Sequence, residues 1–138
     1  MEALYDEAVV ERDDLRFTEF EHDGAGTLAQ VGLIGTVFCC SGALVKVTKW
    51  MGVRRLRRRE FEVRTDYYQY HAWLPKSRQK RQLPLLRYDH AHGSEPHRHE
   101  FDANGNCSDV RQLTLDTIPR LDDVLREAAE LCAERSAS

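Results

Sequence analysis

The chain has 138 residues, of which 41% are hydrophobic and 31% charged, and its formal net charge is -3. This length fits one domain with a single core, and the composition excludes disordered and fibrous proteins. Residues 46–81 hold twelve basic and three acidic residues, whereas residues 1–23 hold nine acidic and two basic residues. A single domain over residues 1–138 can therefore present a basic face although the whole chain is weakly acidic.

The N-terminal part of the chain is expected to form strands after a short helix. Residues 1–11 fit a short amphipathic helix, and residues 15–20 read as a strand. Residues 28–38 and 43–50 fit two further strands joined by a short turn. The first of these two is apolar on both faces, which predicts a central position in a sheet.

Residues 24–45 carry no charged residue over nearly the length of a membrane-spanning helix. Five glycines and several β-branched residues disfavour a helix there, so strands are predicted and no membrane contact is expected. The four cysteines lack CxxC spacing and no secretory signal is recognised. These features predict a cytoplasmic protein with reduced thiols.

Residues 61–73 show the clearest strand alternation, with Phe61, Val63, Tyr67 and Trp73 on one face. Because that face also carries Phe61 and Val63, core contacts are the favoured role of Tyr67 and Trp73. Some aromatic residues near the basic segment are candidates for stacking on unpaired bases. These are Trp50, Tyr68, Tyr70 and Trp73.

Residues 85–89 and 96–101 predict two short strands, and Asn104–Gly105 is a strong hairpin signal. An apolar stripe predicts a C-terminal helix that is capped by Thr117 and ends near Glu134. The expected fold is a single α+β domain. In it, a largely antiparallel sheet of six or seven strands is covered by the C-terminal helix.

Four of the six histidines lie within ten residues, as the pairs His90 and His92, and His97 and His99. Residues two apart in a strand point to the same face, so a hairpin of the two segments would bring imidazoles together beside Asp89. Histidine transfers protons and binds metals near neutral pH. The cluster therefore predicts a functional site, whereas single histidines in surface turns are usually solvated.

Two chemistries fit this cluster. In metal-independent RNA cleavage, one imidazole takes the proton from a 2′-OH, a second protonates the leaving oxygen, and a cation or tyrosine stabilises the developing charge. In the other, the histidines hold a divalent metal such as Zn, Ni, Cu or Mn. The candidate catalytic residues are Asp89, His92, His97, His99, Tyr88 and Arg87. The candidate metal ligands are His90, His92, His97 and His99.

The basic middle segment predicts contacts with the phosphates of a nucleic acid. The alternative is a solvated connection that pairs with the acidic ends of the chain or with an acidic partner. The candidate nucleic-acid-binding residues are Arg54, Arg55, Arg57, Arg58, Arg59, Lys76, Arg78, Lys80 and Arg81.

The order of five segments resembles the TumE family of prokaryotic toxin-antitoxin proteins. The segments are Leu15–Phe20, Arg64–Tyr70, Arg87–His92, Pro96–His99 and Asp122–Arg126. The family's hallmark is an Arg-Tyr-Asp-Asn-type strand followed after a short turn by a His-x-His element, and His90 stands where Asn is commoner. The resemblance implies a toxin that is encoded beside a DNA-binding antitoxin.

The expected function is therefore that of a small toxin that acts on RNA and is held in check by a cognate antitoxin protein. One alternative is a non-catalytic module that binds a metal or a protein. Another is an enzyme that transfers a nucleotide or other group to RNA or protein, although no nucleotide-binding loop motif is present. An edge strand of the sheet could pair with the antitoxin or with a second copy, which would give a homodimer.

Overall fold

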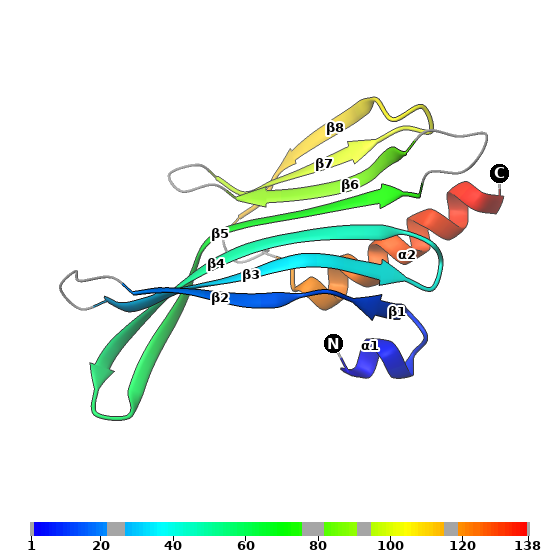
Figure 1. Ribbon diagram of the computed structural model, residues 1–138. Helices are drawn as coiled ribbons and strands as arrows, with labels where there is room; N and C mark the ends of the chain where they lie inside the picture. The colour runs from blue at the N-terminus through cyan, green and yellow to red at the C-terminus, as the bar shows by residue number, and fades with distance from the viewer. Residues whose placement is uncertain (1, 22–26, 76–81, 91–94, 115–118, 138) are drawn as a thin grey trace.

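The computed structural model describes residues 2–21, 27–75, 82–90, 95–114 and 119–137, which form one antiparallel sheet and two helices (Figure 1). The helices are α1 (Glu2–Asp6) and α2 (Leu121–Ala137). The strands are β1 (Val10–Asp13), β2 (Arg16–Glu21), β3 (Thr27–Cys39), β4 (Leu44–Arg57), β5 (Glu60–Leu74), β6 (Leu83–His90), β7 (His97–Phe101) and β8 (Cys107–Gln112). Their order in the sheet is β1-β3-β4-β5-β6-β7-β8, with β2 also paired to β3.

The predicted α+β fold is confirmed, and the described residues form eight strands where six or seven were expected. One added strand, β1, begins at Val10, inside the segment expected to be helical, because Ala8 adopts a positive φ of 57° and the helix stops before it. The other, β8, follows the turn at Gly105, whose φ is 83°. The predicted helix cap at Thr117 lies outside the described residues.

Alternation along the strands gives the sheet a covered face and an open face. On the covered face, buried side chains of the central strands contact α2, whose own buried residues include Val124, Leu125 and Ala128. Tyr88 on β6 donates a hydrogen bond of 2.7 Å to Glu127 on α2, which fixes the helix to the sheet. Burial of one leucine such as Leu125 contributes about 1.5–3 kcal/mol to stability. The open face is the other side of the sheet.

The face assignment predicted for β5 is inverted. Tyr68 and Tyr70 are 0% and 2% exposed in the core, so the prediction that they stack on bases is wrong. Tyr67 and Trp73, expected in the core, are half-buried on the open face. Phe61 and Val63 had suggested a core face, but they lie outside the core and are 55% and 60% exposed.

The reason is that β4 and β5 are longer than the strands on either side of them. No described strand pairs with the outer edge of β5 before Tyr68, and β3 pairs with β4 only as far as Arg54. From there the two strands continue as a projecting hairpin, the arm (residues 54–67, Figure 1). The turn at its tip includes Arg59, which adopts a φ of 72°. The run of arginines predicted to bind phosphates therefore stands at the end of an arm.

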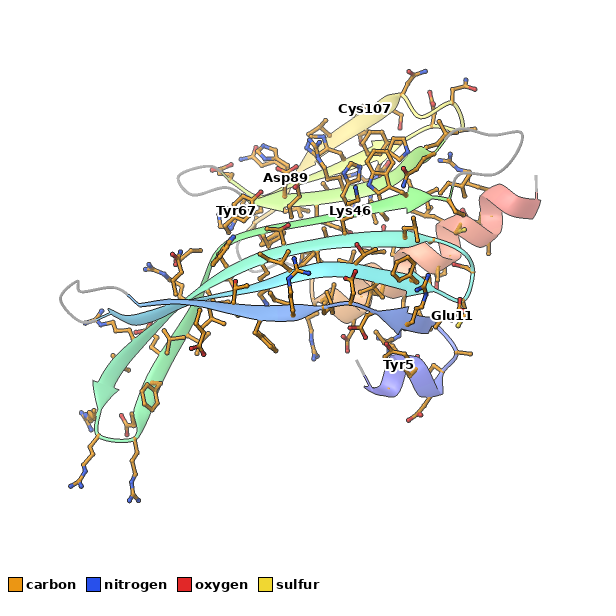
Figure 2. All side chains as sticks on the ribbon, viewed as in Figure 1. Tyr5, Glu11, Lys46, Tyr67, Asp89 and Cys107 are labelled. Atoms are coloured by element: carbon orange, nitrogen blue, oxygen red, sulfur yellow. The ribbon has the colours of Figure 1, made fainter. Side chains whose placement is uncertain are left out.

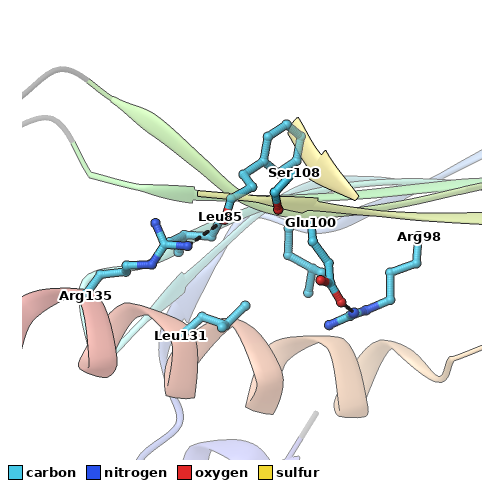
Figure 3. Close-up of a pocket in the computed structure, with 8 residues that line it drawn as sticks. Leu85, Arg98, Glu100, Ser108, Leu131 and Arg135 are labelled. Atoms are coloured by element: carbon cyan, nitrogen blue, oxygen red, sulfur yellow. Dashed lines mark hydrogen bonds and ion pairs between the residues drawn. The ribbon is translucent and has the colours of Figure 1, made fainter. Parts of the chain in front are cut away.

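A small cavity of about 220 Å³ lies between α2 and the β6–β8 end of the sheet (Figure 3). Arg135 reaches from α2 to donate a 2.6 Å hydrogen bond to the carbonyl of Phe101, and Arg98 forms ion pairs with Glu100 and Glu127. Pockets that hold small ligands are usually larger, about 300–1,000 Å³. The cavity is a gap under the helix, and its arginines are already bound to a carbonyl and to carboxylates of the protein itself.

No helix among the described residues is long and apolar enough to cross a membrane.

Candidate functional site on the open face

The β6–β7 hairpin brings two pairs of predicted site residues together on the open face. Arg87 lies opposite His99, and Asp89 lies opposite His97. Side chains that are directly opposite in an antiparallel pair point to the same side of the sheet. The two predicted strands pair with each other as β6 and β7, and this pairing places these four side chains side by side.

Asp89 holds Arg87 and His99 in fixed positions. Its Oδ2 accepts a 2.9 Å hydrogen bond from Arg87 Nε and lies 3.1 Å from His99 Nε2. The same Nε2 is 3.2 Å from Arg87 Nη2. In the tautomer with hydrogen on Nε2, this nitrogen donates to the carboxylate and Nδ1 of His99 is the basic nitrogen; in the other tautomer, Nε2 accepts from Arg87 Nη2.

His97 completes the cluster on β7. Its ring centroid is 6.4 Å from that of His99, and the two rings are inclined by 49°. Two imidazoles at this separation can stand on either side of one phosphodiester group. This is the arrangement that acid–base cleavage needs.

The cluster continues across the sheet as a row that includes a histidine not predicted for the site. His71 on β5 lies opposite Arg87 on one side and opposite Lys46 on the other. Lys46, His71, Arg87 and His99 therefore form one line over four neighbouring strands, here called the polar row. Lys46 and Asp89 are both labelled in Figure 2. The alternation of residues 61–73 was the signal that could have found His71.

Aromatic side chains lie on both sides of the polar row. Trp73 and Phe101 are next to His71, with ring centroids 4.0 Å and 6.3 Å from its own. On the other side, Trp50 on β4 lies opposite Tyr67 on β5. The open face thus combines cations and imidazoles with aromatic rings, which is a combination that suits phosphates and bases.

Two imidazoles of the row are kept neutral. Burial lowers the pKa of His71 to about 4, and the positive charges of Arg87 and Lys46 and the neighbouring His99 act in the same direction, against the opposing charge of Asp89. The pKa of His99 is also lowered, first by burial and then by Arg87, while Asp89 acts in the opposite direction. His71 Nε2 is buried without a hydrogen-bond partner in the described part of the chain. A neutral imidazole can take up a proton, as a general base must.

His71 should make the stability of the protein depend on pH. Its pKa is about 4 in the folded state and near 6.5 when exposed, so only the unfolded chain binds the proton as the pH falls through this window. The free energy of unfolding should therefore fall between pH 6.5 and pH 4 by about 1–2 kcal/mol more in the wild type than in His71→Phe, after allowance for partial exposure. Urea denaturation at several pH values measures this difference. Equal pH dependence of the two proteins would contradict the assignment.

The remaining predicted residues of the histidine segment do not join this cluster. Tyr88 is on the covered face, where it accepts a 2.9 Å hydrogen bond from Arg98 Nε and contacts α2. His90 lies opposite the buried Tyr68, and the two rings are T-shaped with centroids 5.7 Å apart, so His90 also belongs to the covered face. His92 lies outside the described residues. Within the described ranges, no three His, Cys, Asp or Glu side chains are grouped as metal ligands.

The predicted phosphate-binding arginines lie far from the cluster. Arg54, Arg57, Arg58 and Arg59 are exposed in the arm, and Arg55 lies in the same segment of β4. From His71 to the tip of the arm, β5 runs about ten residues, or about 30 Å of extended chain. The other predicted basic residues, Lys76, Arg78, Lys80 and Arg81, lie outside the described residues.

The fold and the site together define a single-domain α+β protein that carries a histidine- and cation-lined polar row on the open face of its sheet. Comparisons of the chain with family models, with curated proteins and with solved structures found no match. The resemblance to the TumE family accordingly stays a prediction that rests on the sequence segments named above.

Proposed function

We propose that the open face binds single-stranded RNA and cleaves its backbone by acid–base catalysis. The observation that carries this proposal is the cluster in which Asp89 holds Arg87 and His99, with His97 at 6.4 Å from His99. The cluster supplies two proton-transfer groups and a cation within reach of one phosphate. RNA cleavage in which the ribose 2′-hydroxyl is the nucleophile needs these groups.

In the proposed reaction, His99 takes the proton of a ribose 2′-OH while the 2′-oxygen attacks the adjacent phosphorus. A bond forms between that oxygen and phosphorus, and the bond from phosphorus to the 5′-oxygen of the next nucleotide breaks. Protonated His97 gives its proton to this 5′-oxygen. The products are a 2′,3′-cyclic phosphate and a 5′-hydroxyl, and Arg87 stabilises the extra negative charge on the phosphoryl oxygens in the transition state.

Three features support a single-stranded substrate. Trp73 and Phe101 on one side of the polar row, and Tyr67 on the other, offer aromatic faces on which unpaired bases stack. Lys46 is exposed at the end of the row and can contact a neighbouring phosphate. An open sheet face with aromatic rings can bind splayed, unpaired bases more readily than it can enter the grooves of a duplex.

We further propose that this activity is that of a toxin which a cognate antitoxin protein restrains. The support is the resemblance of the five sequence segments to the TumE family. Because the site lies on the open face, an antitoxin that covered this face would block the access of RNA to it.

The proposal is tested with purified, untagged protein and a single-stranded RNA oligonucleotide. Cleavage is expected in the presence of EDTA, with 2′,3′-cyclic phosphate ends identified by mass spectrometry. The matched control is the same oligonucleotide with 2′-deoxyribose, which should remain intact because it lacks the attacking hydroxyl. Absence of RNA cleavage, loss of cleavage with EDTA, or cleavage of both oligonucleotides would show the proposed reaction to be wrong.

A further inference from the structure

Strand β8 is an exposed edge of the sheet. It pairs with β7 on one side, all six of its residues are exposed, and no described strand pairs with its other side (Figure 1). Natural proteins usually block such edges with proline, lysine or a bulge. The sequence of Cys107–Gln112 contains neither proline nor lysine, and Val110 is 49% exposed. The register shift of β8 against β7 lies at the start of the strand, between Cys107 and Asp109. From Asp109 onward the edge is therefore open to another strand.

The charged residues of β8 make the strand complementary to a second, antiparallel copy of itself. Asp109 and Arg111 flank Val110, so in an antiparallel pair centred on Val110 each Asp109 lies opposite Arg111 of the second copy. Opposite charges across neighbouring strands stabilise the pair, and like charges destabilise it. We propose that two copies of this chain pair through β8 in this register and form a twofold-symmetric dimer with one continuous sheet.

The symmetry leaves few other registers. In an antiparallel pair, residues that lie opposite each other point to the same side of the sheet. A twofold axis must therefore pass beside one residue, which lies opposite the same residue of the second copy. An axis at Asp109 would place two aspartates opposite each other, and an axis at Arg111 would place two arginines opposite each other. Within the charged part of the strand, the axis at Val110 alone avoids like charges and also brings two exposed valines into contact.

The dimer would join the two open faces. Val110 lies opposite His99 on the neighbouring strand, so the contact of the two valines extends the polar row of one copy into that of the other. The two His99 residues are then three strand spacings apart, about 14 Å. The pairing itself does not rest on the proposed function. If that function holds, one RNA strand can contact both catalytic clusters.

Six residues from each copy make a small interface compared with those of stable dimers. The dimer should therefore be weak, and its population should rise with protein concentration. Analytical ultracentrifugation over a concentration series up to the high micromolar range measures this. The mass should rise from that of one chain, 16.0 kDa, toward twice that value.

Charge reversal provides a specific test. Asp109→Arg should be monomeric because it places an arginine opposite each Arg111, and Arg111→Asp should be monomeric because it places an aspartate opposite each Asp109. An equimolar mixture of these two variants should dimerise again, since every cross-strand pair is then opposite in charge. The double variant Asp109→Arg with Arg111→Asp should also dimerise. Circular dichroism checks that each variant is folded.

Phe17→Ser on β2, near the other edge of the sheet, is the matched control because Phe17 is 70% exposed and distant in strand order. It should leave the dimer unchanged. The proposal is overturned if the wild type keeps the mass of one chain at every concentration. It is also overturned if the mixture and the double variant stay monomeric, or if Phe17→Ser dissociates the dimer while the β8 variants do not. These readouts are masses, so failure of RNA cleavage would not affect them.

Discussion

Replacement of His97 and His99 together by alanine is expected to reduce kcat/KM for cleavage of single-stranded RNA by about 10²–10⁴-fold. The two imidazoles are the proton donor and acceptor of the proposed reaction, and they lie on the same face of β7 with ring centroids 6.4 Å apart. Both are partly exposed, so their removal leaves the core intact. Cleavage of a fluorogenic oligonucleotide by purified variants measures the loss, with circular dichroism as the check on folding.

His90→Gln is the matched control for this double variant. His90 belongs to the same histidine segment of the sequence, but it points to the covered face and contacts Tyr68. RNA cleavage by His90→Gln should therefore proceed at the wild-type rate. Unchanged cleavage by the His97 and His99 variant, or an equal loss in His90→Gln, would contradict the role of the open face.

This contrast shows what the histidine spacing could and could not predict. Period-two spacing correctly placed His97 beside His99, because alternation is a local property of any strand. The face on which each pair lies depends on which residues of the strand face α2. In β6, Leu86 and Tyr88 lie in the core. His90 follows the same parity as these two core residues, so it lies on the side opposite Asp89.

The same limit applies to β5. Its alternation was visible in the sequence, but the apolar pair Phe61 and Val63 indicated the wrong core face because both residues lie in the arm. The lengths of β4 and β5 relative to β3 and β6 decide where the sheet ends and the arm begins, and these lengths depend on long-range pairing. Alternation places His71 on the same face as Tyr67 and Trp73, and the pairing with Lys46 and Arg87 brings it into the site.

Composition located the arginine cluster in the sequence but not in space. The run of arginines was expected to bind the phosphates of an RNA, and the histidines were expected to form the active centre. In the structure, the tip of the arm is separated from His71 by about ten residues of β5, or about 30 Å of extended chain. An RNA that contacts both would need to extend along the whole of β5, so the arm and the polar row are separate surfaces that can be varied independently.

Arg87→Met is expected to lower kcat/KM for RNA cleavage by about 10²–10³-fold, since it removes the cation that faces the developing phosphoryl charge. Methionine keeps an unbranched chain of similar volume on the strand. Arg87 also contacts His99 Nε2 at 3.2 Å and donates to Asp89. Its loss should therefore change the acid–base behaviour of His99 in addition to the rate.

The direction of this change follows from the charges around His99. Burial lowers the pKa of His99 first, and Arg87 lowers it further, while Asp89 opposes both. Without Arg87 the pKa of His99 should rise, so the general base loses its free nitrogen at a higher pH. The acidic limb of the profile of kcat/KM against pH should move to higher pH in Arg87→Met.

Lys46→Met is the control that separates charge removal near His99 from a general loss of positive charge on the open face. Lys46 lies in the same polar row but two strands farther away, opposite His71. It acts on the pKa of His71 and is not among the groups that shift the pKa of His99. Lys46→Met should weaken substrate binding and leave the acidic limb in place. If the limb stays at the wild-type pH in Arg87→Met, or moves equally in both variants, His99 is not the base whose charge Arg87 controls.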